Sequence, residues 1–398
     1  MVICKIEKGD LGSMKKWMVA LVLGLFILST LTGCGAPTPA KPAADDKEKP
    51  SKIGVVTSLT GERALTGQYS KNGILLAIEE ANAKGGINGR KLEAFFEDDG
   101  GNEPGAVNAY NKVVNTGADL IIGPIYSNMN MAMSPGIKKA EIPTMVIGSS
   151  NSLAKEQNPW MFQVRTADAI SAAAIANYAS KNLKLKKVAL LHDTDNFASG
   201  AAAVAQKALE DNKTPAILKE SYNSGDKDYT PLLAKIKASG ADGILAWSHM
   251  VEAGLIMKQM KALDINVPLI GSNSYATKIA LDLAKASAEG VYSVADYAHT
   301  SPAPKTVEFA KKYKEKYKID SEFNAAMNYD AVSLAIEAFT KAGSTDKKKV
   351  RDTLASIKDY VGVSTTYTFD KNNVGGTGVW IVQVKNGAPV VIEAAKGR

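Results

Sequence analysis

Short apolar segments alternate with helix-length amphipathic segments through most of the chain after Ser51. The pattern is clearest at 53–56, an apolar run, and at 73–83, where apolar side chains recur on one face of a helix. It further predicts strands at 92–97, 119–123, 143–147, 187–192, 216–222, 243–247 and 267–270, and helices at 103–115, 128–140, 200–211, 229–238 and 251–263. Such alternation predicts parallel sheets covered by helices, and its restart near 187 predicts two similar α/β lobes.

The last third of the chain departs from this alternation. Helical patterns at 306–317, 324–342 and 347–357 are followed by strand patterns at 364–369, 379–384 and 390–394. Gly375-Gly376 and Asn386-Gly387 supply the turns that a small antiparallel segment needs.

The N-terminal segment predicts export. Two lysines, Lys15 and Lys16, precede a short apolar run at 17–28, which is typical of a secretory signal peptide and too short for a comfortable membrane span. The sequence Leu31-Thr32-Gly33-Cys34 resembles the lipobox of bacterial lipoproteins, so Cys34 is expected to carry lipid and to begin the mature chain. An uncleaved signal anchor is the alternative. We expect residues 1–33 to form the signal peptide, with translation starting at Met14, and residues 34–51 to form a Pro-rich flexible linker.

Composition limits the chemistry of the remaining body. About 350 residues suit two domains, and Cys4 and Cys34 are the only cysteines of the chain. The body therefore has neither disulfides nor thiolate metal sites. The net charge of +7 comes from scattered lysines, with only five arginines. Clustered arginines interleaved with aromatic residues would indicate a nucleic-acid site, and that pattern is missing.

A set of motifs spread over 52–384 carries a family resemblance. They are Val55-Val56-Thr57-Ser58-Leu59-Thr60-Gly61, Gly67-Gln68-Tyr69, Asn72-Gly73, residues 81–90, Glu97-Asp98-Asp99, Ile121-Ile122-Gly123-Pro124, Arg165-Thr166, residues 226–229, Asn328-Tyr329-Asp330-Ala331 and Thr368-Phe369-Asp370. In this order they resemble the leucine/isoleucine/valine-binding protein family, the extracytoplasmic solute-binding proteins of ABC transporters.

The resemblance implies two Rossmann-like lobes joined by a three-crossover hinge. The crossovers are expected near Ala167-Asp168, Ala295-Asp296 and Thr366–Thr368. Lobe 1 would then contain 52–167 and 297–366, and lobe 2 would contain 168–296 and 367–398. The implied partners are a small ligand and a membrane permease with separate ATPase subunits. A monomer without cofactor is expected.

Ligands of open α/β sheets bind beyond the carboxyl ends of the strands. Tyr126-Ser127 stands at such an end, where Ser127 is expected to N-cap the next helix and free backbone amides favour an anion. The resemblance implies that Ser127 binds a ligand carboxylate, although an ordinary cap would look the same. It also implies contacts from the loop Gly148–Asn151, through Ser149 or Ser150, where a plain turn is the alternative.

The second lobe is expected to contribute aromatic residues. Phe197 stands where the family usually has a tyrosine that covers the ligand, and Trp247 and His249 end another predicted strand. Tyr329, from the first lobe, is a further candidate that core packing explains nearly as well. Three histidines without close pairing do not predict a metal site.

Asn273 is the main departure from the family pattern, because amino-acid-binding relatives tend to carry Glu or Asp there to pair the ligand ammonium. An amide oxygen accepts a hydrogen bond but supplies no countercharge. Either Asp195 or Glu252 supplies the charge, or the ligand has no ammonium. A branched-chain or other hydrophobic amino acid and a non-amino-acid carboxylate or aromatic acid both remain open.

Enzyme motifs are missing from the sequence. It contains no Gly-x-Gly-x-x-Gly after the first strand, no phosphate-binding loop and no Gly-x-Ser-x-Gly elbow. The pair Asp98-Asp99 is interpreted as a solvated or hinge-supporting pair rather than a catalytic one. A sensory ligand-binding protein is a third reading, and it would need a second membrane segment and a signalling module.

Overall fold

The structure, a computed structural model, describes residues 49–396. The predicted signal peptide, Cys34 and most of the predicted linker lie outside these residues. Within the described part of the chain, no helix combines the length and hydrophobicity that crossing a membrane requires.

The first lobe is built on a parallel five-stranded sheet with the order β2-β1-β3-β4-β5. Side chains of β1, the second strand in that order, alternate between two cores. Ile53 and Val55 belong to one hydrophobic cluster, and Val56 belongs to the other. Both faces are therefore buried, as a parallel sheet requires. The strands are β1 (Ser51–Thr57), β2 (Leu92–Asp98), β3 (Leu120–Ile122), β4 (Thr144–Val146) and β5 (Met161–Gln163).

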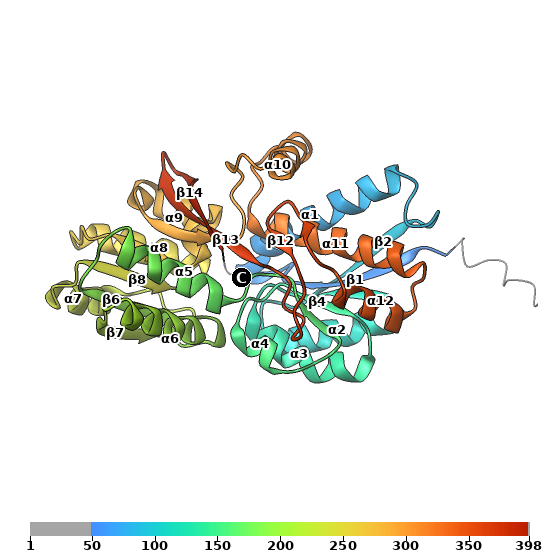
Figure 1. Ribbon diagram of the computed structural model, residues 1–398, viewed down its shortest axis with the longest axis horizontal. Coiled ribbons are helices and arrows are strands. Elements are labelled where there is room, and N and C mark those ends of the chain that lie inside the picture. Colours follow the sequence, from blue (N-terminus) through green and yellow to red (C-terminus); the bar gives the residue numbers. More distant parts are fainter. Residues whose placement is uncertain (1–48, 397–398) are drawn as a thin grey trace, which may run out of the picture. The chain divides into compact units, whose positions relative to one another are not determined.

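Helices cover both faces of this sheet (Figure 1). One core contains side chains of α1, α10, α11 and α12, and the other contains side chains of α2 and α3. Their bounds are α1 (Ala64–Ala83), α2 (Glu103–Asn115), α3 (Ser127–Ala140), α4 (Asn151–Lys155), α10 (Pro304–Tyr317), α11 (Phe323–Ala342) and α12 (Lys347–Ala355), with a short 3-10 turn, η1 (Gly61–Arg63), before α1.

The second lobe has a seven-stranded sheet with the order β14-β13-β10-β9-β8-β6-β7. The strands from β7 to β10 are parallel, whereas β13 is antiparallel to both β10 and β14. The strands are β6 (Val188–Asp193), β7 (Ala216–Tyr222), β8 (Gly243–Trp247), β9 (Leu269–Gly271), β10 (Tyr292–Ala295), β13 (Gly378–Lys385) and β14 (Ala388–Lys396).

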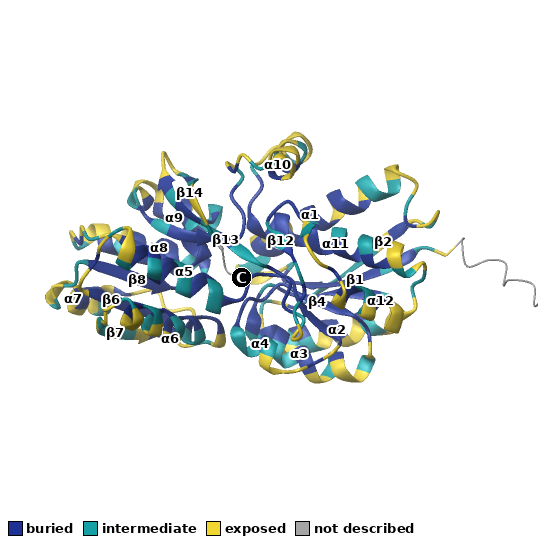
Figure 2. Ribbon diagram, in the orientation of Figure 1, coloured by how far each residue is buried: buried dark blue, intermediate teal, exposed yellow. Residues whose placement is uncertain are grey.

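Helices again lie on both faces of the second sheet. Side chains of α5 and α6 form one core, and side chains of α7, α8 and α9 form the other. Figure 2 shows the central strands of this sheet as buried and much of the outward helix surface as exposed. The edge strands β7 and β14 are partly exposed. The bounds are α5 (Asp168–Lys181), α6 (Asn196–Asp211), α7 (Thr230–Ala238), α8 (Met250–Ala262) and α9 (Lys278–Ala284), with 3-10 turns η2 (Asn273–Ala276) and η3 (Lys285–Ala288).

The chain passes between the two sheets three times. The first passage lies between β5 and α5, and the second between β10 and α10. The third lies later than the expected position at 366–368. Phe369 packs edge-on against Phe162 of β5 at 5.5 Å, and the Gly375 amide donates to the Gln163 carbonyl at 2.9 Å. Residues 367–376 therefore follow the first sheet, and the chain crosses just before β13.

The two predicted turns have different outcomes. Asn386-Gly387 joins β13 to β14 with φ of 52° and 73°, the left-handed conformation that a two-residue hairpin needs. Gly375-Gly376 is not a turn. The chain reverses at 370–373, and a Cβ at Gly376 would lie 2.3 Å from the Thr166 amide nitrogen, so glycine is required there for close backbone packing.

Candidate ligand-binding site

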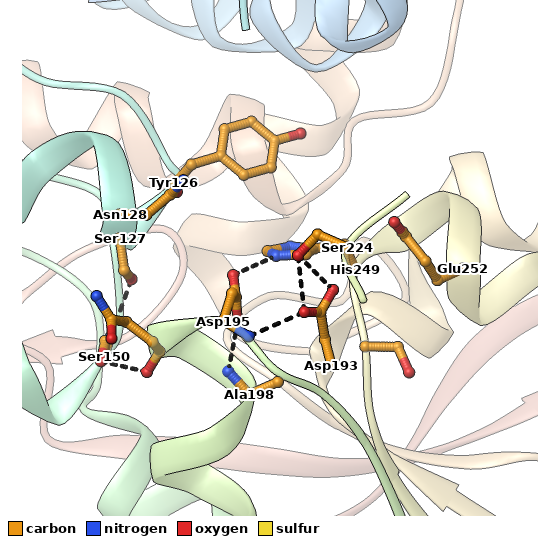
Figure 3. Close-up of polar contacts among 12 residues, drawn as sticks. Tyr126, Ser127, Asn128, Ser150, Asp193, Asp195, Ala198, Ser224, His249 and Glu252 are labelled. Carbon is orange, nitrogen blue, oxygen red and sulfur yellow. Dashed lines mark hydrogen bonds and ion pairs between the residues drawn. The ribbon is translucent and has the colours of Figure 1, made fainter. Parts of the chain in front are cut away.

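The carboxyl ends of β3 and β4 are linked through Ser127. The N-cap of α3 is Tyr126, not Ser127 as expected, and Ser127 is the first helical residue. Its hydroxyl is directed to the neighbouring loop instead, where Ser127 Oγ accepts from the Ser150 amide at 3.1 Å (Figure 3). A Cβ at Gly148 would lie 2.8 Å from the same oxygen, so glycine allows this approach.

The loop after β4 also reaches the second lobe. Ser150 caps α4, and its hydroxyl donates to the Asn196 carbonyl at the start of α6, at 2.8 Å. Ser149 is buried, and its Oγ has no hydrogen-bond partner among the described residues. The start of α6 therefore meets the loop that was predicted to bind the polar end of a ligand.

Aromatic rings from both lobes gather beside this contact. Phe197 stacks on His249 with centroids 5.0 Å apart, and Tyr126 of the first lobe lies 5.5 Å from the same imidazole. Tyr126 is in turn covered by the Arg63 guanidinium, 3.8 Å from its ring centroid. Arg63 was not predicted, although it is one of only five arginines.

His249 and Asp195 form a partly buried pair with Nε2 and Oδ2 2.8 Å apart (Figure 3). Burial lowers the pKa of His249, but the hydrogen bond to Asp195 and the charge of that carboxylate outweigh it, so the net shift is upward. Burial raises the pKa of Asp195, and His249 outweighs this in the opposite direction. Asp195 also caps α6 by accepting from the Ala198 amide at 2.8 Å. Its charge is therefore already balanced within the second lobe.

A cavity of about 210 Å³ opens next to the Tyr126–His249 contact and is lined from both lobes. Glu252, one of the two acids expected to face a ligand ammonium, lines it and accepts from the Gly225 amide at 3.2 Å. The cavity is also lined by Arg63, Thr66, Tyr126, His249 and Met250.

The acid pair Asp98-Asp99 holds the loop that carries Arg63. Asp98 accepts from the Leu59 amide at 2.8 Å, and Asp99 accepts from the Ser58 hydroxyl at 2.6 Å. Asp99 is fully buried, so it is not a solvated residue. The two carboxylates fix the loop between β1 and α1 rather than the hinge.

A second polar cluster lies where the chain crosses between lobes. Arg165 donates to Asp296 Oδ2 from Nε at 2.9 Å and from Nη2 at 2.6 Å, and Asn273 Nδ2 donates to the same oxygen at 3.3 Å. The Asn273 amide thus contacts an acid from the neighbouring strand end. Asn273, Asp296 and Phe323 line a cavity of about 140 Å³.

Two predicted site residues are not brought to the cleft surface. Trp247 is buried in the core of the second lobe, beneath Phe197, with centroids 6.2 Å apart. Tyr329 packs on Phe309 at 4.9 Å and donates to Glu80 at 3.0 Å, on the outer side of the first lobe. Core packing, the alternative considered for Tyr329, accounts for both. Among residues 49–396 no group of His, Cys, Asp and Glu side chains has the geometry of a metal site.

The sequence model of the periplasmic binding protein family matches residues 50–389. The chain therefore belongs to this family. It is 28% identical over 320 residues to Leu/Ile/Val-binding protein homolog 2 of Brucella abortus, an alignment that covers 80% of this chain and 85% of the relative. It is also 28% identical over 309 residues to the leucine-, isoleucine-, valine-, threonine-, and alanine-binding protein of Pseudomonas aeruginosa, covering 76% and 81%.

Solved structures share the two-lobe fold. The substrate binding protein LivJ of the branched-chain amino acid transporter of Streptococcus pneumoniae, in complex with isoleucine, superposes with a TM-score of 0.81 at 26% identity, covering 87% of this chain and 100% of that one. A solute binding protein from R. palustris in complex with benzoate has a TM-score of 0.80 at 20% identity, covering 87% and 97%. The type I periplasmic-binding fold predicted from sequence is confirmed.

Proposed function

We propose that this protein is the substrate-binding lipoprotein of an ABC importer. Membership of the periplasmic binding protein family supports an extracytoplasmic location and a permease with ATPase subunits as partner. Lipidation at Cys34 would hold the body at the membrane surface, and the chain would act as a monomer without cofactor. The observation that carries the proposal is the meeting of the Ser127–Ser150 link with the start of α6, which places strand ends and helix starts of both lobes around one site.

The site favours a small solute with a carboxylate. The first backbone amides of α3 have no acceptor within their own helix, and helix starts stabilise negative charge. Ser127 and Ser149 add hydroxyls beside these amides. Phe197 and Tyr126 offer apolar ring surface for the rest of the molecule. A branched-chain or other hydrophobic amino acid suits this combination, as the names of the relatives suggest.

Two alternatives follow from specific observations. Asn273 in place of an acid, together with the benzoate-bound structural neighbour, favours a carboxylate without an amine. A sensory protein would use the same cleft without a permease. Catalysis is not proposed, because the relatives named above are binding proteins.

Ser127→Ala tests the site. The substitution would remove the hydroxyl proposed to lie beside the ligand carboxylate, which is also the acceptor for the Ser150 amide. A hydrogen bond to a charged group contributes about 1.5–3 kcal/mol. We expect a fall in affinity of about 10- to 100-fold, measured by calorimetry on the solute that most raises the melting temperature in a panel of amino, aromatic and aliphatic acids.

Ser127→Ala combined with Phe197→Ala should abolish the ligand-induced thermal shift while the protein stays folded. Ser333→Ala is the matched control, because that hydroxyl bonds the Tyr329 carbonyl of its own helix at 3.0 Å, outside the cleft. Unchanged affinity in the double variant, or an equal loss in Ser333→Ala, would refute the site.

A further inference from the structure

The edge of the first sheet at which the chain enters the body is rich in basic residues. β1 starts at Ser51, whose amide donates to the Lys91 carbonyl at 2.8 Å, directly before the parallel strand β2. Arg90 Nε donates to the Lys49 carbonyl, also at 2.8 Å. Lys52 is the second residue of β1. Because parallel strands begin at one edge of a sheet, these basic residues lie together, and we call this region the entry edge.

The start of α12 adds three lysines beside the entry edge. Asp119, directly before β3, accepts from the Lys52 amide at 2.8 Å, which places this acid at the same edge. Burial raises the pKa of Asp119, and nearby groups lower it: the Lys52 amide first, then the charges of Arg90, Lys52 and Lys347. Lys347 therefore lies within electrostatic reach of the same carboxyl group. Lys347–Lys349 are the first residues of α12, and all three are exposed.

The basic residues of the entry edge have no acidic partners, unlike the lysines of α10. Lys311, Lys312, Lys314 and Lys316 of α10 each form an ion pair with a carboxylate. Within residues 49–396, the lysines of the entry edge, Arg90 and Lys347–Lys349 form none. Their positive charge is therefore free to act on an anionic surface outside the protein.

The entry edge lies away from the cleft. The strands of the first sheet end at the opposite edge, where Asp98 ends β2 and Glu103 begins α2. A strand with the seven residues of β1 spans about 20 Å, which separates the two edges. A surface that contacts the entry edge therefore leaves the cleft side of the first lobe open to solution.

The proposed function brings a membrane within reach of this edge. It assigns a lipid to Cys34, and residues 35–48 connect Cys34 to Lys49. Even when fully extended, this stretch reaches at most about 50 Å. The entry edge is thus the part of the body that is attached directly to the lipid anchor. Each Lys or Arg close to an anionic bilayer favours contact by about fivefold, and the attraction falls off within a Debye length of about 10 Å at 0.1 M salt.

We propose that the entry edge and Lys347–Lys349 dock on anionic lipid headgroups of the membrane to which the chain is anchored. This docking holds the first lobe on the bilayer and keeps the cleft side turned towards solution, where solute is captured. The inference rests on the lipid anchoring of the proposed function. Charge complementarity supports it, because cations without a protein partner would meet lipid phosphates, and the anchor keeps the two surfaces close together.

The test uses the lipidated chain, produced in a bacterium that processes lipoproteins and inserted into nanodiscs. One set of discs contains phosphatidylcholine alone, and the other also contains phosphatidylglycerol. In a Cys4→Ser background, a single fluorophore is attached through Asn115→Cys or Pro104→Cys, which lie near opposite ends of α2 and are exposed. These positions are about 17 Å apart along the helix, with Asn115 towards the entry edge. Energy transfer to an acceptor lipid reports how close each end comes to the bilayer.

Phosphatidylglycerol should raise the ratio of energy transfer at position 115 to that at position 104, compared with phosphatidylcholine alone. The anchor is the same in both discs, so the difference reports the attraction between the body and the headgroups. At about 1 M salt, where the Debye length is about 3 Å, the ratio should fall to its value in phosphatidylcholine.

A triple variant with Lys347→Gln, Lys348→Gln and Lys349→Gln should lose the effect of phosphatidylglycerol. At about fivefold for each lysine, the equilibrium should shift about 100-fold towards the undocked body. The matched control carries Lys311→Gln, Lys314→Gln and Lys316→Gln, which remove the same charge from the ion-paired lysines of α10, and it should keep the wild-type ratio. Melting temperatures near that of wild type confirm that both variants are folded.

Equal ratios in the two kinds of disc, or an equal loss in the two triple variants, would overturn the inference and leave the anchored binding protein in place. Docking on a soluble polyanion would overturn it as well: polyphosphate would then bind wild type more tightly than the α12 variant, while the two discs give the same ratio. If Cys34 carries no lipid and the chain does not enter the discs, the proposed anchoring fails, and the inference falls with it.

Discussion

At the scale of single residues, the buried acids of this protein are compensated in different ways. Asp330 accepts from the amides of Val363 and Ser364 and from the Tyr367 hydroxyl, so its charge is spread over several donors. The charge of Asp296 is balanced by an ion pair with Arg165. Glu322 has only local donors, the Ala325 amide at 3.3 Å and the Asn324 side chain at 2.8 Å.

Glu322 should therefore make stability depend on pH. Burial raises its pKa from 4.5 to about 8. Between these two pKa values the folded state holds a proton that the unfolded chain has released. The stability that this protonation contributes to the folded state is therefore complete below pH 4.5 and is lost as pH rises through about 8.

Glu322→Gln should remove that loss. One unit of pKa shift corresponds to about 1.4 kcal/mol, and we expect the variant to be more stable than wild type at pH 8 by about 1–3 kcal/mol, with little difference at pH 4. Urea unfolding at both pH values measures this difference in the free energy of unfolding. Glu308→Gln, which changes an exposed residue of α10, should alter stability by less than about 0.5 kcal/mol at either pH. Equal pH dependence in wild type and Glu322→Gln would contradict the assignment.

Sequence predicted where the candidate site residues lie in the fold better than it predicted their contacts. Position after a strand was enough to place Ser127, Ser150 and Phe197 near the carboxyl ends of strands, because parallel strands end at one edge of a sheet. It could not show that Ser127 bonds the next loop, since that depends on a close approach at Gly148.

At the scale of elements, the packing of α1 on α11 has a clear cause in the sequence. A Cβ on Gly73 would lie 2.1 Å from the Ala325 carbonyl oxygen, so only glycine lets the two backbones approach this closely. This contact fixes α11, the helix that begins at Phe323 directly after Glu322, against the first sheet.

Gly73→Ala should force the two helices apart. Overpacking of this kind costs about 1–3 kcal/mol or more. The matched control is Gly200→Ala in α6, where nothing lies within 4 Å of the added methyl group. There the higher helix propensity of alanine should stabilise the protein by about 0.5–1 kcal/mol. Urea midpoints that move in the same direction for both variants would contradict this account.

Periodicity predicted the longer strands and most of the amphipathic helices, and all were found. It missed α5, whose alanine-rich sequence has little contrast between faces, and α1 begins at Ala64, earlier than the predicted 73. It also missed β5 and β10. The strand expected at 364–369 is reduced to Thr366–Tyr367, paired with Tyr360–Val361.

At the scale of the whole body, the contacts across the cleft include polar contacts as well as the ring contact of Tyr126 with His249. Ser150 donates to the Asn196 carbonyl, and Lys227 Nζ lies 3.7 Å from Glu62 Oε2 at exposed positions. A surface ion pair contributes about 0–1 kcal/mol, so the Lys227–Glu62 pair alone does not hold the lobes together. Closure therefore depends on a solute that bonds both sides, as hinge-bending binding proteins require.

The distance between the lobes, measured with and without solute, is the most direct test of solute capture between them. Since the body has no cysteine, Glu62→Cys and Lys227→Cys in a Cys4→Ser, Cys34→Ser background carry spin labels at two defined positions. The account predicts a broad distance distribution that becomes short and narrow when the solute found by thermal shift is added, and that stays broad when Ser127→Ala and Phe197→Ala are both present. A distribution that the bound solute leaves unchanged would contradict capture between the lobes.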